Sequence, residues 1–393
     1  MDFRFTKDEE AFRQEVRQFL KDVPPQNFPL QMIDDGHGTG GWSYEYTREL
    51  GKKGWLSRTW PKEHGGLGRS IIDRLILLEE MSYRRAPLSA NFFGDCMAHT
   101  IIKYGNDEIK KQFLPRIGSG EATFWMAFSE PGAGSDLLSL ETRAVEDGDD
   151  YVINGQKVWS SYGHVAEHAF LLARTDSTVP RHKGLSMFII DKGMPGITVR
   201  PLVNMAGVVF HNEVFLDNVR VPKGRLIGQK NQGFPQMLKG LEGDRFWFRC
   251  VKPPYLTGVL EELVEYIKET TGKVATSPRD SALRRRLADH AVDIEVCRLL
   301  FHRAAWIMAG GTDPVYEASA GKILVDELAC RFLNTGMQVM DFYGMVRAGS
   351  KWAKLGGAMV HWYLTTPGQN FGGGSSEIGR NTVALRGLKL PAS

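Results

Sequence analysis

The sequence predicts an α+β fold, with a helical N-terminal domain, a middle antiparallel β domain of sandwich or barrel-like form, and a C-terminal four-helix bundle. Two observations predict it. Apolar residues recur at helical spacing near both ends of the chain, and short alternating or apolar runs separated by turn formers fill the middle. A length of 393 residues exceeds one compact core, so several domains are expected. We place them at residues 1–121, 122–231 and 232–393.

Helical spacing marks the N-terminal region. One helix face is predicted from four apolar residues spaced three or four apart: Phe12, Val16, Phe19 and Leu20. Pro24 and Pro25 end this helix, because proline lacks the amide donor and clashes with the preceding turn. A second run with helical spacing covers Ile71–Met81.

The spacing of apolar residues changes after about residue 122. Four short apolar or alternating runs predict strands: Tyr151–Trp159, Ala169–Ala173, Leu185–Ile190 and Val214–Leu216. Turn-forming residues such as Glu146–Asp150 separate them. Together these runs predict several antiparallel strands in a compact β domain.

Helical spacing returns after residues 231–234 and continues almost to the end of the chain. Long helices are expected over Leu256–Glu269, Ser281–Ala309 and Val315–Leu333, with a further helix near Met359. These segments predict the C-terminal bundle.

Composition excludes several classes of protein. The formal net charge of +3 is too small to indicate nucleic-acid binding. The densest basic run, Arg284–Arg286, is interpreted as a solvated helix face, with contact to a phosphate-bearing ligand as the alternative. Four widely spaced cysteines argue against a disulfide framework or a metal site: Cys96, Cys250, Cys297 and Cys330. The charged N-terminus lacks a secretory signal, and no apolar run has membrane-spanning length, so a cytoplasmic protein without membrane association is expected.

The segment Phe128–Asp136 is the richest in chemical features. Gly132, Ala133 and Gly134 offer little side-chain bulk, so backbone amides there can approach an anionic or polar ligand closely; a plain tight turn is the alternative. The glycine spacing fits neither the dinucleotide fingerprint nor the phosphate loop. About 20 residues on, Gly155–Ser161 places a tryptophan and two serines at the end of a predicted strand. The indole could pack on a flat ring system or be a core residue.

Read together, these two segments resemble the acyl-CoA dehydrogenase family. Further stretches continue the resemblance in the same order, and the whole set spans nearly the full chain: Asn154–Ser161, Leu171–Arg174, Val219–Pro222, Gly228–Phe234 and Gly373–Ile378. The resemblance implies an FAD cofactor, an acyl-CoA substrate, electron-transfer flavoprotein as the electron acceptor, and a tetramer, of identical or of different chains. It implies that a base removes the α-proton of the thioester while the β-hydride moves to the flavin. It also implies that a cofactor hydroxyl and a backbone amide donate to the thioester oxygen, which stabilises the developing enolate.

The resemblance also assigns residues to the flavin ring. Phe128 and Ser129 match the strand whose backbone and hydroxyl face the flavin. Trp159 and Ser161 match the pair that contacts the ring from the other side.

Other matching positions contact the rest of the cofactor or the CoA. Gly134 and Ser135 match the glycine-rich loop, with Ser135 near the CoA chain. Gln338 matches a residue that contacts the FAD of a neighbouring subunit. Ser375 and Glu377 match positions at the diphosphate or adenosine end of the cofactor.

The chain departs from the family at the catalytic base. Many members carry a glutamate where this sequence has Gly373, which we assign to the substrate site. A subset uses a carboxylate that directly precedes an arginine on an earlier helix, and Asp244 and Arg245 match that pair. We expect Asp244 to be the base, with Arg245 beside the substrate. The alternative is an exposed Asp–Arg pair without a chemical role, and Glu242 is a weak competitor.

Asp95 is a second candidate carboxylate. It lies in a predicted helical region among apolar residues, and is either a helix cap or surface residue, or a buried functional group. A buried Asp95 could contact a polar or ring-bearing acyl group or take a proton in a 1,4-elimination. Because some family members that act on alicyclic acyl-CoAs rely on aspartates, an alicyclic or branched substrate is a hypothesis.

A further departure affects the cofactor site. Family members often have Gln-x-x-Gly-Gly, whereas this chain has Asp341 and Phe342 after Gln338. A carboxylate near a diphosphate is unfavourable by charge. Two alternatives to a dehydrogenase therefore stay open: a flavoenzyme with a different reaction, and a catalytically weak or silent subunit of a heterotetramer.

Overall fold

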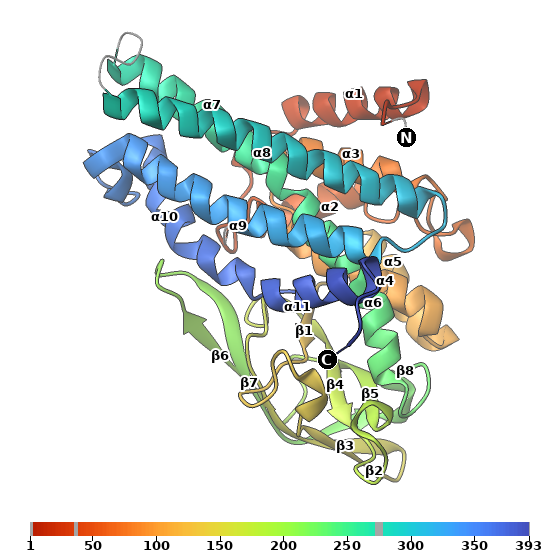
Figure 1. Cartoon of the computed structure of the whole chain (residues 1–393). Coiled ribbons are helices and arrows are strands. Elements are labelled where there is room, and N and C mark those ends of the chain that lie inside the picture. Colours follow the sequence, from red (N-terminus) through yellow and green to blue (C-terminus); the bar gives the residue numbers. More distant parts are fainter. Residues whose placement is uncertain (1–2, 35–37, 272–277, 393) are drawn as a thin grey trace.

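The structure, a computed structural model, describes residues 3–34, 38–271 and 278–392. Within these ranges, the side chains of residues 91–92, 239–245, 271 and 278–280 lie outside the description. The chain is helical at both ends with a β-sheet between, which confirms the predicted α+β fold class (Figure 1).

Five α-helices form the N-terminal part: α1 (Lys7–Asp22), α2 (Tyr44–Lys52), α3 (Ile71–Tyr83), α4 (Ser89–Tyr104) and α5 (Asp107–Gly118). Helix α1 begins with a capping box, in which Thr6 and Glu9 each bond the other's backbone amide. Its buried residues are the four predicted ones: Phe12, Val16, Phe19 and Leu20. The helix ends at Asp22, with Val23 as its C-cap before the two prolines, and packs against α3. Both predicted N-terminal helices are therefore confirmed.

The middle of the chain forms one eight-stranded sheet. Its strands are β1 (Phe124–Ala127), β2 (Arg143–Asp147), β3 (Asp150–Lys157), β4 (His168–Arg174), β5 (Leu185–Asp191), β6 (Ile197–Val203), β7 (Val209–Pro222) and β8 (Leu226–Ile227). The strand order is β6-β7-β3-β2-β4-β5-β8, with β1 pairing to β4. The predicted runs fall in β3, β4, β5 and β7.

The pairing of β1 with β4 differs from the predicted antiparallel arrangement. These two strands run parallel, with Trp125 opposite Ala169. A parallel pair needs a long connection, and the β2–β3 hairpin supplies it because it lies between them in sequence.

Six helices follow the sheet: α6 (Gly233–Cys250), α7 (Lys252–Thr271), α8 (Pro278–Ala309), α9 (Val315–Met340), α10 (Ala358–Thr365) and α11 (Ser376–Thr382). Helices α7, α8 and α9 are long and pack on one another, as predicted for the bundle (Figure 1). Helix α6 contacts α4, α9 and β5, so it joins all three regions. Its first residue, Gly233, lies against the backbone of Ser186, where a side chain has no room.

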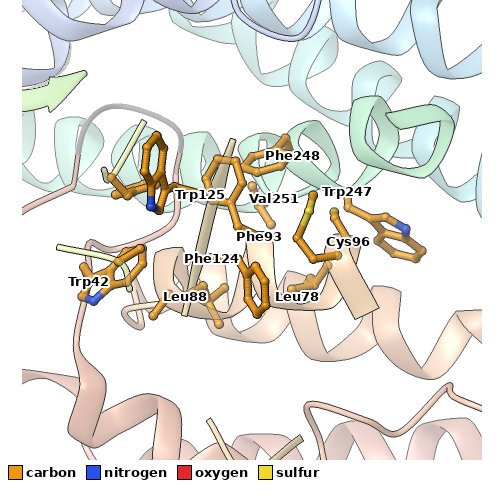
Figure 2. Close-up of a cluster of buried hydrophobic side chains, with 14 of the residues drawn as sticks. Trp42, Leu78, Leu88, Phe93, Cys96, Phe124, Trp125, Trp247, Phe248 and Val251 are labelled. Atoms are coloured by element: carbon orange, nitrogen blue, oxygen red, sulfur yellow. The ribbon is translucent and has the colours of Figure 1, made fainter. Parts of the chain in front are cut away.

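The three regions share a buried aromatic core. Figure 2 shows Phe93 of α4, Trp125 of β1 and Phe248 of α6 in this cluster. The rings of Phe93 and Phe248 have centroids 4.9 Å apart. Aromatic side chains bury large apolar areas, so this cluster fixes the helical regions against the sheet. Among the described residues, none of the helices combines the length and hydropathy needed to cross a bilayer.

Candidate active site

The glycine-rich loop begins where β1 ends. Glu130 and Ala133 exchange two backbone hydrogen bonds of 2.9 and 3.0 Å, which close a tight turn. Gly132 and Gly134 lie on its exposed outer side, and a Cβ added at either would meet no atom within 4 Å. The backbone of this loop is therefore open to a ligand. Ser135 is also exposed.

A buried ion pair holds the loop to β3. The ammonium of Lys157, whose side chain is 0% exposed, donates to the carbonyl of Phe128 (3.0 Å) and to Oε1 of Glu130 (2.8 Å). Burial lowers the pKa of Lys157 to about 8, although Glu130 opposes this shift. The amides of Glu141 and Thr142 also donate to the carboxylate of Glu130.

The loop and the end of β3 therefore lie side by side. The amide of Val158 donates to the carbonyl of Ser129 at 2.9 Å. Side chains alternate between the two faces of a strand, and Lys157 lies on the same buried face of β3 as Tyr151 and Ile153. This spacing in the sequence could have identified Lys157 as a buried lysine.

Trp159 and Ser161 follow β3 on the same side. Trp159 is 62% exposed and has φ of +58°, an unusual conformation for a bulky residue. Its ring meets the imidazole of His211 edge to face at 5.7 Å, and Ser161 Oγ lies 3.3 Å from Nδ1 of His211. Because the indole is exposed, it is available to a flat ring, and the alternative of a core tryptophan is wrong.

The start of α11 and the segment before it carry three of the predicted positions. Ser375 caps α11, since its hydroxyl accepts from the amide of Ile378. Glu377 lies exposed in the first turn, and hydrogen bonds to its own backbone amide and to Ser375 lower its pKa. Gly373 is exposed with φ of +68°, a conformation that favours glycine.

A buried charge cluster lies between α6, α7 and α9. Asp326 is fully buried and pairs with Arg249 at 2.9 Å, with Lys322 at 3.3 Å and with Lys252. Burial opposes ionisation of this carboxyl group, but the three cations hold the pKa of Asp326 at about 2. Burial likewise lowers the pKa of Lys322 to about 8.

The cluster extends to the segment that contains Gly373. Arg249 Nη2 donates to the carbonyl of Gly372 at 3.0 Å and to that of Gln369 at 3.2 Å. Lys322 donates to the carbonyl of Asn370 at 2.8 Å. Helix α6, which carries Asp244 and Arg245, is thereby joined to this segment. The side chains of Asp244 and Arg245 themselves lie outside the described residues.

Asp95 is buried in the middle of α4, so the helix-cap or surface interpretation is wrong. Its Oδ2 pairs with Nη2 of Arg74 at 2.5 Å, and its Oδ1 accepts from Nε1 of Trp60 at 3.1 Å. Arg74 in turn stacks on Trp247 of α6 at 3.9 Å. Both carboxylate oxygens therefore have partners within the protein.

Gln338 lies near the end of α9, away from the other predicted positions. Its Oε1 accepts from Arg286 at 2.7 Å. Helix α11 packs on α9 near Ile323 and Glu327, and at 1.5 Å per residue Gln338 is about 20 Å further along the helix. Within a single chain, Gln338 therefore lies far from Ser375 at the start of α11.

Asp341 ends α9 with φ of +52° and ψ of −132°. This is a backbone conformation in which glycine is comfortable and other residues are strained. The backbone at this position is therefore of glycine type although the residue is an aspartate.

These features place an exposed aromatic ring and an open glycine-rich loop on a β domain that packs against a helical bundle. The N-terminal, middle and C-terminal domain families of acyl-CoA dehydrogenases match residues 6–121, 125–219 and 231–388, respectively. The chain belongs to the acyl-CoA dehydrogenase family.

Several relatives match over nearly their whole length. "Acyl-CoA dehydrogenase FadE26" of Mycobacterium tuberculosis is 33% identical, covering 100% of this chain and 99% of that protein. "Acyl-CoA dehydrogenase IpdE1" of the same organism is 31% identical over 98% of each chain.

Solved structures agree. The "Tcur3481-Tcur3483 steroid ACAD" has a TM-score of 0.89 at 31% identity, covering 100% of both chains. The "ChsE4-ChsE5 complex from Mycobacterium tuberculosis" has a TM-score of 0.84 at 31% identity, also covering 100% of both chains.

Members of this family are flavoproteins, and the residues present suit a flavin. The exposed indole of Trp159, the hydroxyl of Ser161 and the open backbone of the glycine-rich loop offer an aromatic face and polar donors at adjoining positions. Within the described residues, no group of three or more potential metal ligands comes together.

Proposed function

We propose that the chain is an FAD-dependent acyl-CoA dehydrogenase that converts an acyl-CoA thioester into a 2-enoyl-CoA. The observation that carries the proposal is the junction at Arg249, which joins the helix of Asp244 to the segment of Gly373. When bound, the flavin supplies the acceptor for the β-hydride. Phe128, Ser129, Trp159 and Ser161 would hold its ring.

Asp244 is our proposed base. A base must have a lone pair directed at the α-proton. Because both oxygens of Asp95 are engaged by Arg74 and Trp60, Asp244 is favoured over Asp95. Arg245 would lie beside the substrate and favour the ionised form of Asp244. The paired Asp95 could still take part in a 1,4-elimination if a substrate displaced one of its partners.

Gly373 is our proposed donor to the thioester oxygen, through its backbone amide. The α-proton of a thioester is weakly acidic, so the charge that develops on this oxygen needs a fixed donor. Ser135 and Gly134 would contact the CoA and cofactor chains. Ser375 and Glu377 would lie at the diphosphate or adenosine end of the FAD.

The substrate class that we propose is an alicyclic or branched acyl-CoA. One solved neighbour carries "steroid ACAD" in its title, which supports a ring-bearing acyl group here. Gly373 has no side chain and lies exposed, a feature that leaves room beside the thioester.

The proposed partners are electron-transfer flavoprotein and further subunits of a tetramer, in the cytoplasm. Exposed apolar residues on the bundle support assembly: Val292, Val296, Leu299, Trp306, Phe342 and Trp352. Within such a tetramer Gln338 would contact the FAD of a neighbouring subunit. The tetramer that we propose could consist of identical or of different subunits. One similar solved structure is a complex of two proteins, ChsE4 and ChsE5.

A second candidate is a weak or silent subunit beside an active partner chain. Two observations favour it: glycine replaces the usual glutamate at position 373, and a carboxylate stands at position 341. An anionic side chain there opposes a diphosphate by charge, and Asp341 holds a strained backbone conformation.

The test is anaerobic reduction of the purified flavoprotein by straight-chain, branched and alicyclic acyl-CoAs. Rapid bleaching by the alicyclic or branched class is expected. Bleaching by straight chains alone would overturn the substrate class. A protein purified without flavin, or with flavin that no acyl-CoA reduces, would favour the silent subunit. Adding a co-expressed partner chain then distinguishes a dependent subunit from a different reaction.

A further inference from the structure

Asp326 forms ion pairs with three cationic side chains, and two of these side chains also donate hydrogen bonds to the loop before α11. Arg249 and Lys322 both bond Asp326, and their remaining donors reach main-chain carbonyls between residues 369 and 372. Among the described residues, the ammonium of Lys252 donates to Asp326 alone. The carboxylate therefore fixes two cationic side chains that hold a glycine-rich backbone.

The contact at Gly372 determines the direction of the next amide. The carbonyl of Gly372 and the N–H of Gly373 belong to one peptide unit, which is planar and trans, so they point in opposite directions. Arg249 Nη2 holds that carbonyl at 3.0 Å. The N–H of Gly373 accordingly points away from the guanidinium.

We propose that Arg249 is a positioning residue that orients the amide of Gly373 toward the thioester oxygen of the bound acyl-CoA. The inference rests on the proposed dehydrogenase function. A charged donor on the carbonyl also polarises the peptide unit, which makes its N–H a stronger donor. The guanidinium suits this role because one planar group reaches Asp326, Gln369 and Gly372 together.

Arg249 also couples this donor to the base. It lies on α6 five residues after Asp244, about 1.4 helical turns further along. Helix α6 thus carries the proposed base and, through Arg249, holds the loop that contains the proposed donor. Proton removal and enolate stabilisation act on adjacent atoms of the thioester, so their relative placement matters: a misplacement of about 1 Å can cost about a hundredfold in rate.

The test compares Arg249→Gln and Arg249→Lys with Lys252→Met. Lys252 is a matched control because it is equally buried and bonds the same carboxylate, whereas among the described residues its ammonium donates no hydrogen bond to the loop. Three quantities are measured on the flavin-loaded protein. These are kcat and KM for the acyl-CoA that reduces the wild type, the carbonyl stretching frequency of a bound, isotope-labelled 2-enoyl-CoA, and amide hydrogen exchange of residues 369–376.

We expect Arg249→Gln to lower kcat about a hundredfold with little change in KM, because a transition-state donor is displaced. The carbonyl frequency should rise toward that of the free thioester, and exchange in the loop should quicken about tenfold or more. Arg249→Lys, which keeps the charge without the planar fork, should give an intermediate result. Lys252→Met should leave all three quantities as in the wild type.

An unchanged carbonyl frequency in both Arg249 variants, or an equal change in Lys252→Met, would overturn the positioning role. If Arg249→Gln does not fold, Arg249→Lys carries the comparison. Failure of the proposed function is seen separately, as a wild type that no acyl-CoA reduces. The exchange measurement needs no turnover and still reports whether Arg249 holds the loop.

Discussion

The buried pair of Lys157 and Glu130 gives a prediction with a defined pH dependence. The substitution Glu130→Gln removes the carboxylate that lies 2.8 Å from a fully buried ammonium. Two backbone amides also lose a charged acceptor, which costs about 1–2 kcal/mol. The further cost depends on whether Lys157 is charged.

The pKa of Lys157 in the folded protein is about 8, below its usual 10.5. The unfolded chain therefore binds more protons between these values, so the contribution of this group to stability rises with pH across that window and is lost as pH falls through 8. Without Glu130 the lysine can become neutral. At pH 7, about one pKa unit below 8, this limits the extra cost to about 1 kcal/mol.

We therefore expect Glu130→Gln to lower the free energy of unfolding by about 3 kcal/mol at pH 7 and by about 1 kcal/mol less at pH 9, where Lys157 is already largely neutral. Urea titration at the two pH values measures both. Glu146→Gln, an exposed carboxylate of the same sheet that bonds Lys230, is the control and should show no measurable change. Equal costs at pH 7 and pH 9 would refute the reasoning.

Three further predictions follow from single residues. Asp341→Gly should raise the free energy of unfolding by about 1 kcal/mol, because it relieves a strained φ of +52°; a lower urea midpoint would contradict this. Trp159→Ala should reduce bound flavin in the purified protein with little change in thermal stability, since the ring is exposed, and full flavin occupancy would show that Trp159 does not hold the ring. Trp306→Glu should weaken subunit assembly in light scattering, because it places a charge on an exposed apolar face of α8; an unchanged mass would locate the interface elsewhere.

Local patterns in the sequence predicted the elements because burial imposes a period on each of them. The face of α1 and the alternating strands β3 and β7 follow directly from it, whereas β4 and β5 are buried at successive positions and were predicted from continuous apolar runs. The parallel pairing of β1 with β4 could not be predicted, because pairing direction depends on how the chain returns to the sheet.

The charge cluster at Asp326 had no local signal. Lys322 lies one helical turn before Asp326, but Arg249 is 77 residues from Asp326 and 123 residues from Gly372. Only the packing of α6 on α9 brings these groups together. Lys157 was closer to prediction, because a charged residue at an inward position of a strand demands a buried partner.

The proposed base was reached from the resemblance rather than from periodicity. On a helix, Asp244 and Arg245 adjoin in sequence but lie on different sides, so their spacing alone does not indicate a common task. For Asp95 the sequence left a helix cap or surface residue and a buried functional group as alternatives. Asp95 is buried, and its ion pair with Arg74 supplies a structural reason for that burial.

The most direct test of the dehydrogenase mechanism is the rate of flavin bleaching in a single anaerobic turnover, compared for wild type, Asp244→Asn, Asp95→Asn and Glu242→Gln. Asp244→Asn keeps the shape of the side chain and removes only the base. We predict rapid bleaching by the preferred acyl-CoA in the wild type and in Glu242→Gln, and a loss of about a hundredfold or more in Asp244→Asn with flavin still bound. Bleaching at the wild-type rate in Asp244→Asn would contradict the mechanism, and a loss confined to Asp95→Asn would move the base to α4.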